Sequence, residues 1–220
     1  MFSKLATVFT ALTFAAAALM SPTPASAQTP PNPALRTSPC AVFYAGDSLT
    51  FSQFWDGQLY NKTLAARIGF SGEFAKPGLS VREVGPYVAA RAPRMPKVVV
   101  LALGTADLYA NTPPQVYDAQ LRSMVKNLGE SRKIIFVNIV FRRNAFDPNA
   151  VSKENAYNAI LAKIDKQYPS VTTLDWSTFV LARLHLFDAK DWTNVHYNVA
   201  GSTARSNLYV AAVKTACTQR

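Results

Sequence analysis

The sequence predicts one α/β domain built on a mainly parallel sheet. Three nearly continuous apolar runs, at residues 41–45, 97–103 and 134–140, are typical of buried strands, and amphipathic stretches of helical period separate them. Strands that are apolar on both faces indicate a parallel sheet covered by helices on both sides. The alternation of strands and helices favours right-handed crossovers between neighbouring strands.

The strands are taken in chain order. The first, Ala41–Ala45, ends at Gly46-Asp47-Ser48, and the strongest, Lys97–Leu103, ends at Gly104. Ile134–Val140 is the third, and Val171–Asp175 is a weaker candidate. A further strand near Gly72–Ala75 has little apolar signal, because glycine and glutamate interrupt it.

Three helices fit the stretches between and after these strands. The first has Thr112 as its cap, Pro113 in its first turn and Gly129 as its stop, and its apolar stripe comprises Tyr117, Leu121, Val125 and Leu128. The second has a stripe from Tyr157 to Tyr168 and ends before Pro169. The third runs from about Ala200 to Thr215.

Composition excludes several protein classes. The chain has 220 residues, 49% of them hydrophobic, which is too apolar for a disordered chain. Two cysteines exclude a disulfide-dense miniprotein, and a single long apolar run excludes a polytopic membrane protein.

That apolar run has the pattern of a secretory signal. Lys4 supplies the positive start, Leu5–Met20 is apolar, and Ala25-Ser26-Ala27 matches a cleavage site. We expect residues 1–27 to be a signal peptide, 28–39 a Pro-rich tether and 40–220 the single domain. The mature protein would be secreted, periplasmic or held in the cell envelope, with no membrane span. The alternative is an uncleaved membrane anchor.

Export has a consequence for the two cysteines. Cys40 and Cys217 lie near the two ends of the predicted domain, and an oxidising compartment would allow them to form a disulfide. The alternative is two separate buried thiols. With only two histidines, no Cys/His cluster has metal-ligand spacing.

The net charge of +10 favours anionic partners such as acidic polysaccharides, wall polymers or lipid headgroups. No nucleic-acid-binding motif accompanies it. The alternative is a basic surface with no specific partner.

Ligands of parallel α/β sheets bind at the carboxyl ends of the strands, and three such ends are polar here. They are Gly46-Asp47-Ser48-Leu49, Gly104-Thr105-Ala106-Asp107 and Arg142-Arg143-Asn144. Ser48 follows the first strand directly, where backbone N–H groups of a turn can hold an oxyanion. Taken alone, this triplet is equally typical of an ordinary turn.

His196 strengthens the case for chemistry. It follows the last predicted strand, in a segment that can reach back over the strand ends and act as the base that a serine nucleophile needs. The alternative is a surface or capping histidine. His185 has no motif around it, and we interpret it as structural.

The sequence resembles the SGNH (GDSL) hydrolase superfamily over nearly the whole predicted domain. The resemblance rests on Gly46-Asp47-Ser48-Leu49, Gly78, Gly104-Thr105-Ala106-Asp107 and His196, in that order. It implies a flavodoxin-like three-layer α/β/α sandwich, Ser48 as nucleophile, the N–H groups of Ser48 and Gly78 as oxyanion donors, His196 as base and no cofactor. The SGNH domains of cell-surface polysaccharide and peptidoglycan O-acyltransferases and deacetylases look most similar.

Two positions depart from the family pattern. Ala106 stands where the family has an oxyanion-binding Asn, and Thr193 stands where it has the Asp that orients the histidine. The Thr105 hydroxyl is a candidate replacement donor. Asp191, the Thr193 hydroxyl or a backbone carbonyl is a candidate replacement for the aspartate.

Arg142 and Arg143 are candidates for holding a substrate carboxylate or phosphate, the alternative being a solvated loop. The expected function is an exported serine esterase or O-acyltransferase acting on O-acyl esters of envelope glycans or on a small ester. The alternative is an impaired SGNH domain that binds a glycan or a protein.

Overall fold

The structure is a computed structural model that describes residues 40–55, 58–142 and 149–218. All of these belong to the larger of the two units into which the chain divides, Pro31–Arg220. The predicted signal peptide (1–27) and tether (28–39), and Arg143, lie outside the described residues.

Five parallel strands form one sheet in the order β2-β1-β3-β4-β5. They are β1 (Ala41–Gly46), β2 (Gly69–Ala75), β3 (Val98–Ala102), β4 (Lys133–Val137) and β5 (Val171–Leu174). This order is that of flavodoxin-like folds, in which the chain reverses its direction of travel across the sheet next to β1. The predicted fold class is therefore confirmed.

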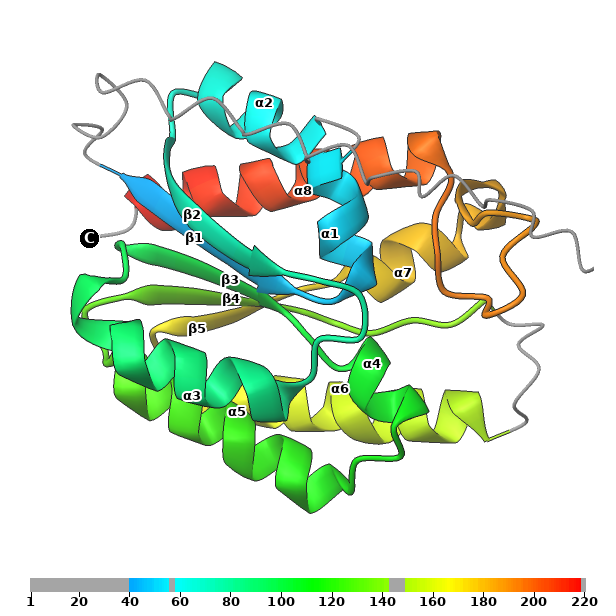
Figure 1. The fold of residues 1–220 in the computed structure, drawn as a ribbon, viewed down its shortest axis with the longest axis horizontal. Helices are drawn as coiled ribbons and strands as arrows, with labels where there is room; N and C mark the ends of the chain where they lie inside the picture. Colours follow the sequence, from blue (N-terminus) through cyan, green and yellow to red (C-terminus); the bar gives the residue numbers. More distant parts are fainter. Residues whose placement is uncertain (1–39, 56–57, 143–148, 219–220) are drawn as a thin grey trace, which may run out of the picture. The chain divides into compact units, whose positions relative to one another are not determined.

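Helices cover both faces of the sheet (Figure 1). One face carries α1 (Ser48–Trp55), α2 (Gln58–Ala65), α7 (Trp176–Leu181) and α8 (Val199–Thr218). The other carries α3 (Val81–Arg91), the short α4 (Thr105–Tyr109), α5 (Pro114–Leu128) and α6 (Ala150–Gln167). Among the described residues, Ala92–Arg94 and Leu184–Leu186 form short 3₁₀ turns. The two apolar layers meet at the sheet, whose central strand β3 is buried along its length.

Three of the differences from the predicted boundaries have a clear reason. β2 spans seven residues although only its last four were predicted, because this edge strand has no continuous apolar run in its sequence. Thr112 does not cap α5, because its hydroxyl donates to Asp107 instead.

The third difference is that β4 stops at Val137, three residues early. Beyond it, side chains of α6 replace the strand ladder: Asn158 accepts the N–H of Ile139, and Glu154 accepts the N–H of Phe141, both at 2.8 Å. The apolar run continues because these residues stay buried, although they are no longer paired with a strand.

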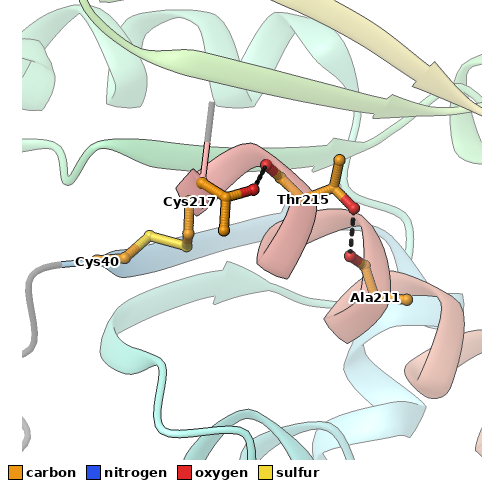
Figure 2. The surroundings of a disulfide bond; sticks show 5 residues. Cys40, Ala211, Thr215 and Cys217 are labelled. Carbon is orange, nitrogen blue, oxygen red and sulfur yellow. Dashed lines mark hydrogen bonds between the residues drawn. A yellow bond between two sulfur atoms is a disulfide. The ribbon is translucent and has the colours of Figure 1, made fainter. Parts of the chain in front are cut away.

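Cys40 and Cys217 form a disulfide, as predicted (Figure 2). The bridge joins the start of β1 to the last turn of α8, across a sequence separation of 177 residues. At this end of α8, the Thr215 hydroxyl donates to the Ala211 carbonyl and the Thr218 hydroxyl donates to the Thr215 carbonyl. The bridge therefore closes nearly the whole described chain into one loop.

Within the described ranges, no helix is both long and apolar enough to span a membrane.

Candidate active site

Ser48 is the first residue of α1, directly after β1. The turn is tight: a Cβ on Gly46 would lie 2.2 Å from Thr50 Oγ1, so only glycine fits there. Asp47 closes the turn, since its side chain accepts the N–H of Leu49 and its carbonyl accepts those of Thr50 and Phe51. The serine is consequently held at a helix N-terminus, where backbone N–H groups favour negative charge.

Asp47 itself is buried. Burial raises the pKa of this carboxyl, while Arg205 on α8, the N–H groups of Leu49 and Ala106 and the Thr105 hydroxyl oppose the rise. Arg205 is also buried, so it compensates the carboxylate inside the protein. Asp47 thus connects the nucleophile turn to the turn after β3.

The sheet order places that turn, and the one after β2, on either side of Ser48. Gly78 lies in the turn after β2 with φ +74°, and the N–H of Lys76 beside it donates to Gly46 O at 3.3 Å. After β3, Gly104 has φ +124°, and a Cβ there would lie 2.3 Å from Ile139 Cδ1. Both turns therefore depend on glycine, for backbone conformation or for space.

Thr105 is the candidate replacement for the missing oxyanion donor. It is the first residue of α4, directly after Gly104. Its hydroxyl and the Ala106 N–H both oppose the rise in the pKa of the Asp47 carboxyl. The role of Thr105 as an oxyanion donor stays a prediction.

The sequence marks Asp107 only as the last residue of Gly104-Thr105-Ala106-Asp107, with no role of its own. It is buried and accepts the N–H of Val81 at 3.1 Å, which joins the turn after β3 to the start of α3. Burial raises its pKa to about 6, against the opposing bonds from Val81 and Thr112. Its only sequence signal was a carboxylate directly after a strongly apolar strand.

His196 reaches Ser48 from the segment between β5 and α8. Three contacts anchor this segment. Phe187 and Tyr197 form an isolated β-bridge. The N–H of Asp188 donates to the His196 carbonyl at 3.0 Å, and Trp176 Nε1 donates to the Tyr197 hydroxyl at 2.7 Å. His196 Nε2 lies 3.0 Å from Ser48 Oγ. This is hydrogen-bond distance, the geometry that lets an imidazole accept a serine proton.

The other ring nitrogen faces Asp191 and Thr193. His196 Nδ1 lies 3.2 Å from Asp191 Oδ2 and 3.2 Å from Thr193 Oγ1. Burial would raise the pKa of Asp191, but bonds from Thr193, His196 and Val195 together hold that pKa well below its usual value. The carboxylate thus lies within reach of the imidazole, although it precedes His196 by five residues.

The remaining predicted residues are distributed as follows. Arg142 follows β4, and its backbone N–H donates to Asn194 O at 2.9 Å, so it borders the His196 segment. Arg143 is not described. His185 is exposed and separate from this cluster.

Exposed aromatic side chains lie near the cluster in sequence and contact. Trp192, between Asp191 and Thr193, is 83% exposed, and the hydroxyl of the half-exposed Tyr109 donates to the Thr193 carbonyl. Trp55 is exposed at the end of α1, whereas Phe54 is buried in the core. Large exposed aromatics beside a reactive cluster are typical of ligand-contacting surfaces.

A family model described as the GDSL-like lipase/acylhydrolase family matches residues 44–204. No curated protein sequence matches the chain.

Solved structures share the fold at low identity. The C-terminal catalytic domain of Streptococcus pneumoniae peptidoglycan O-acetyltransferase A is 19% identical, with a TM-score of 0.59 over 80% of this chain and 92% of that one. An α/β hydrolase from the metagenome of Lake Arreo is 17% identical, with a TM-score of 0.65 over 82% and 98%. An acetylxylan esterase from Geobacillus stearothermophilus is 17% identical, with a TM-score of 0.63 over 80% and 96%.

Proposed function

The chain belongs to the GDSL-like lipase/acylhydrolase family, and from this premise we propose that it is an exported serine esterase or O-acyltransferase. The observation that carries the proposal is the 3.0 Å distance between Ser48 Oγ and His196 Nε2. Its substrates would be O-acyl esters, chiefly those of envelope glycans.

The proposed reaction begins with attack of Ser48 Oγ on the ester carbonyl, while His196 Nε2 takes the serine proton. The backbone N–H groups of Ser48 and Gly78 donate to the oxyanion that forms. The carbonyl–oxygen bond of the ester breaks, the leaving alcohol receives the proton from His196, and the acyl group stays on Ser48.

The second half returns the enzyme to its starting state. Water or a sugar hydroxyl gives its proton to His196 and attacks the acyl carbonyl. The bond to Ser48 Oγ breaks, and the serine recovers its proton. Water yields hydrolysis and a sugar hydroxyl yields acyl transfer, so one site serves either outcome.

Two observations support a glycan ester as substrate, and a third supports export. Two structural neighbours are named as acting on acylated glycans, peptidoglycan and acetylxylan. Trp192 is exposed in the His196 segment, where a flat aromatic face can stack on a sugar ring. The disulfide is typical of proteins that fold in an oxidising compartment, which agrees with export.

The test compares release of acetate by the purified protein from O-acetylated peptidoglycan, from acetylated xylan and from a small aryl acetate. We expect Ser48→Ala to abolish turnover of every ester that the parent cleaves while keeping the parent's unfolding curve. Ser52→Ala, one helical turn further on in α1, is the matched control and should remain active. A Ser48→Ala protein as active as the parent would contradict the proposal.

The second candidate is an impaired SGNH domain that binds a glycan or protein without turnover. Ala106 favours it, because its side chain offers no hydrogen bond to an oxyanion. Loss of one oxyanion donor costs about 10²–10³ in rate. Glycan binding by a folded parent that cleaves none of these esters would favour this candidate.

A further inference from the structure

We infer that Thr193 is a positioning residue, whose hydroxyl bridges the carboxylate of Asp191 and Nδ1 of His196. The inference rests on the proposed function, in which His196 takes the Ser48 proton. It assigns Thr193 a role in holding the imidazole, although threonine carries no charge.

The bridge is visible in three distances. Thr193 Oγ1 lies 2.6 Å from Asp191 Oδ1, 2.7 Å from Asp191 Oδ2 and 3.2 Å from His196 Nδ1. The first two are short, as expected for a hydroxyl that donates to an ionised carboxylate. The third leaves the hydroxyl oxygen facing the imidazole.

The carboxylate of Asp191 is already fully engaged. It accepts the backbone N–H groups of Thr193 at 3.1 Å, Val195 at 2.9 Å and His196 at 2.8 Å, as well as the Thr193 hydroxyl. A carboxylate has about four lone-pair sites, and these four donors occupy them. Asp191 Oδ2 also lies 3.2 Å from Nδ1, but its remaining capacity to accept a further N–H is small.

The hydroxyl oxygen of Thr193 can still accept a hydrogen bond. Its one proton goes to the carboxylate, so its oxygen accepts rather than donates toward His196. Nδ1 must then carry the proton, and the lone pair of the neutral ring lies on Nε2, 3.0 Å from Ser48 Oγ. The bridge therefore fixes the tautomer that a general base needs.

The charge of Asp191 reaches the imidazole through the same contact. When His196 becomes positive, the polarised hydroxyl oxygen and the nearby carboxylate both stabilise it. The arrangement supplies an anionic partner although the residue three positions before the histidine is not an aspartate. Thr193 and Asp191 should consequently behave as one unit in mutational tests.

The direct test is ¹⁵N NMR of the imidazoles in the resting protein, at a pH of about 9, above the ordinary titration range of imidazole. The chain has only two histidines, so His185→Gln leaves the ring of His196 as the single signal. We expect Nδ1–H in this background and in Thr193→Ser, and mixed tautomers in Thr193→Val. Asp191→Asn should favour Nε2–H, because its amide can donate to Thr193 and turn the hydroxyl proton toward Nδ1.

Kinetics on the same variants provide a second readout. We expect Thr193→Val to lower kcat about 10- to 100-fold with little change in KM, Thr193→Ser to restore it, and Asp191→Asn to cost up to about 10⁴-fold. The double variant should be no worse than Asp191→Asn alone. Thr215→Val, which removes an exposed threonine hydroxyl near the end of α8, is the matched control and should retain the parent's kcat.

Thr193→Val with an unchanged tautomer and the parent's kcat would overturn the inference. If the fold losses in kcat of Thr193→Val and Asp191→Asn multiply in the double variant, the two residues act independently. That result would overturn the claim that they act as one unit. If the parent cleaves no ester, the proposed function fails, but the NMR spectra still decide whether the bridge holds the ring.

Discussion

Ser48 Oγ and His196 Nε2 lie 3.0 Å apart although 148 positions separate the two residues in the chain. The parallel sheet places Ser48 at the start of α1, after β1. The anchored segment before α8 holds His196 opposite the serine. The proposed chemistry depends on both being held at once.

His196→Ala should lower the rate of ester cleavage by at least about 10³-fold, because Ser48 loses the group that takes its proton. The rate of acyl-enzyme formation, followed with an aryl ester, measures this loss. His185→Gln removes the exposed histidine and should keep the parent's rate. Equal losses in the two variants would mean that His196 has no special role.

Removing the disulfide should destabilise the fold without changing the site. The bridge closes a loop of 177 residues, and loss of a native disulfide costs about 2–5 kcal/mol of unfolding free energy. Urea unfolding of Cys40→Ser/Cys217→Ser measures the loss, and ester cleavage per folded molecule should be unchanged. A double variant as stable as the oxidised parent would contradict the expectation.

Asp107→Asn should change how stability depends on pH. Since burial raises the folded pKa to about 6, the folded protein holds a proton that the unfolded chain releases near pH 4. The associated stability is present in full below about pH 4 and is lost as pH rises through 6, up to about 3 kcal/mol. Because asparagine mimics the protonated carboxyl, the variant should not show this loss of unfolding free energy as the pH rises.

Urea unfolding of parent and Asp107→Asn at several pH values measures the difference. Asp118→Asn, which removes a partly exposed carboxylate of α5, is the control. A gap between the parent and Asp107→Asn that stays constant across this range would contradict the raised pKa.

Ala106→Asn should increase turnover, because it adds an amide donor to the turn after β3, which flanks Ser48. Restoring one oxyanion donor can raise the rate by up to about 10²-fold. Ala106 is partly exposed. Ala110→Asn, at the exposed end of α4, is the matched control. Lower turnover in a folded Ala106→Asn protein would indicate that another group already fills this place.

The sequence contained most of the fold because the central strands are apolar on both faces. Continuous runs such as 97–103 are hard to mistake, and the turns after β1 and β3 follow from their glycines. The edge strand β2 was less visible, since Ser71, Gly72 and Glu73 interrupt its apolar pattern. Thr112 has the local pattern of a helix cap, and no local pattern indicates that its hydroxyl donates to Asp107 instead.

The sequence predicted which residues lie in the site but not which of them contact one another. Ser48 and His196 stand out by motif and order, but the reach of Asp191 depends on how the segment folds back. Asn194 adopts φ +60° there, and three backbone N–H groups converge on the carboxylate. Tertiary contacts of this kind have no local pattern.

Covalent labelling by a fluorophosphonate probe, with peptide mapping of the adduct, tests the central claim most directly, because it requires an activated serine and no knowledge of the natural ester. The account predicts one adduct, on Ser48, which is absent from Ser48→Ala and forms more slowly in His196→Ala. A folded parent that reacts neither with this probe nor with a small sulfonyl fluoride, or that reacts equally well without Ser48, would contradict it.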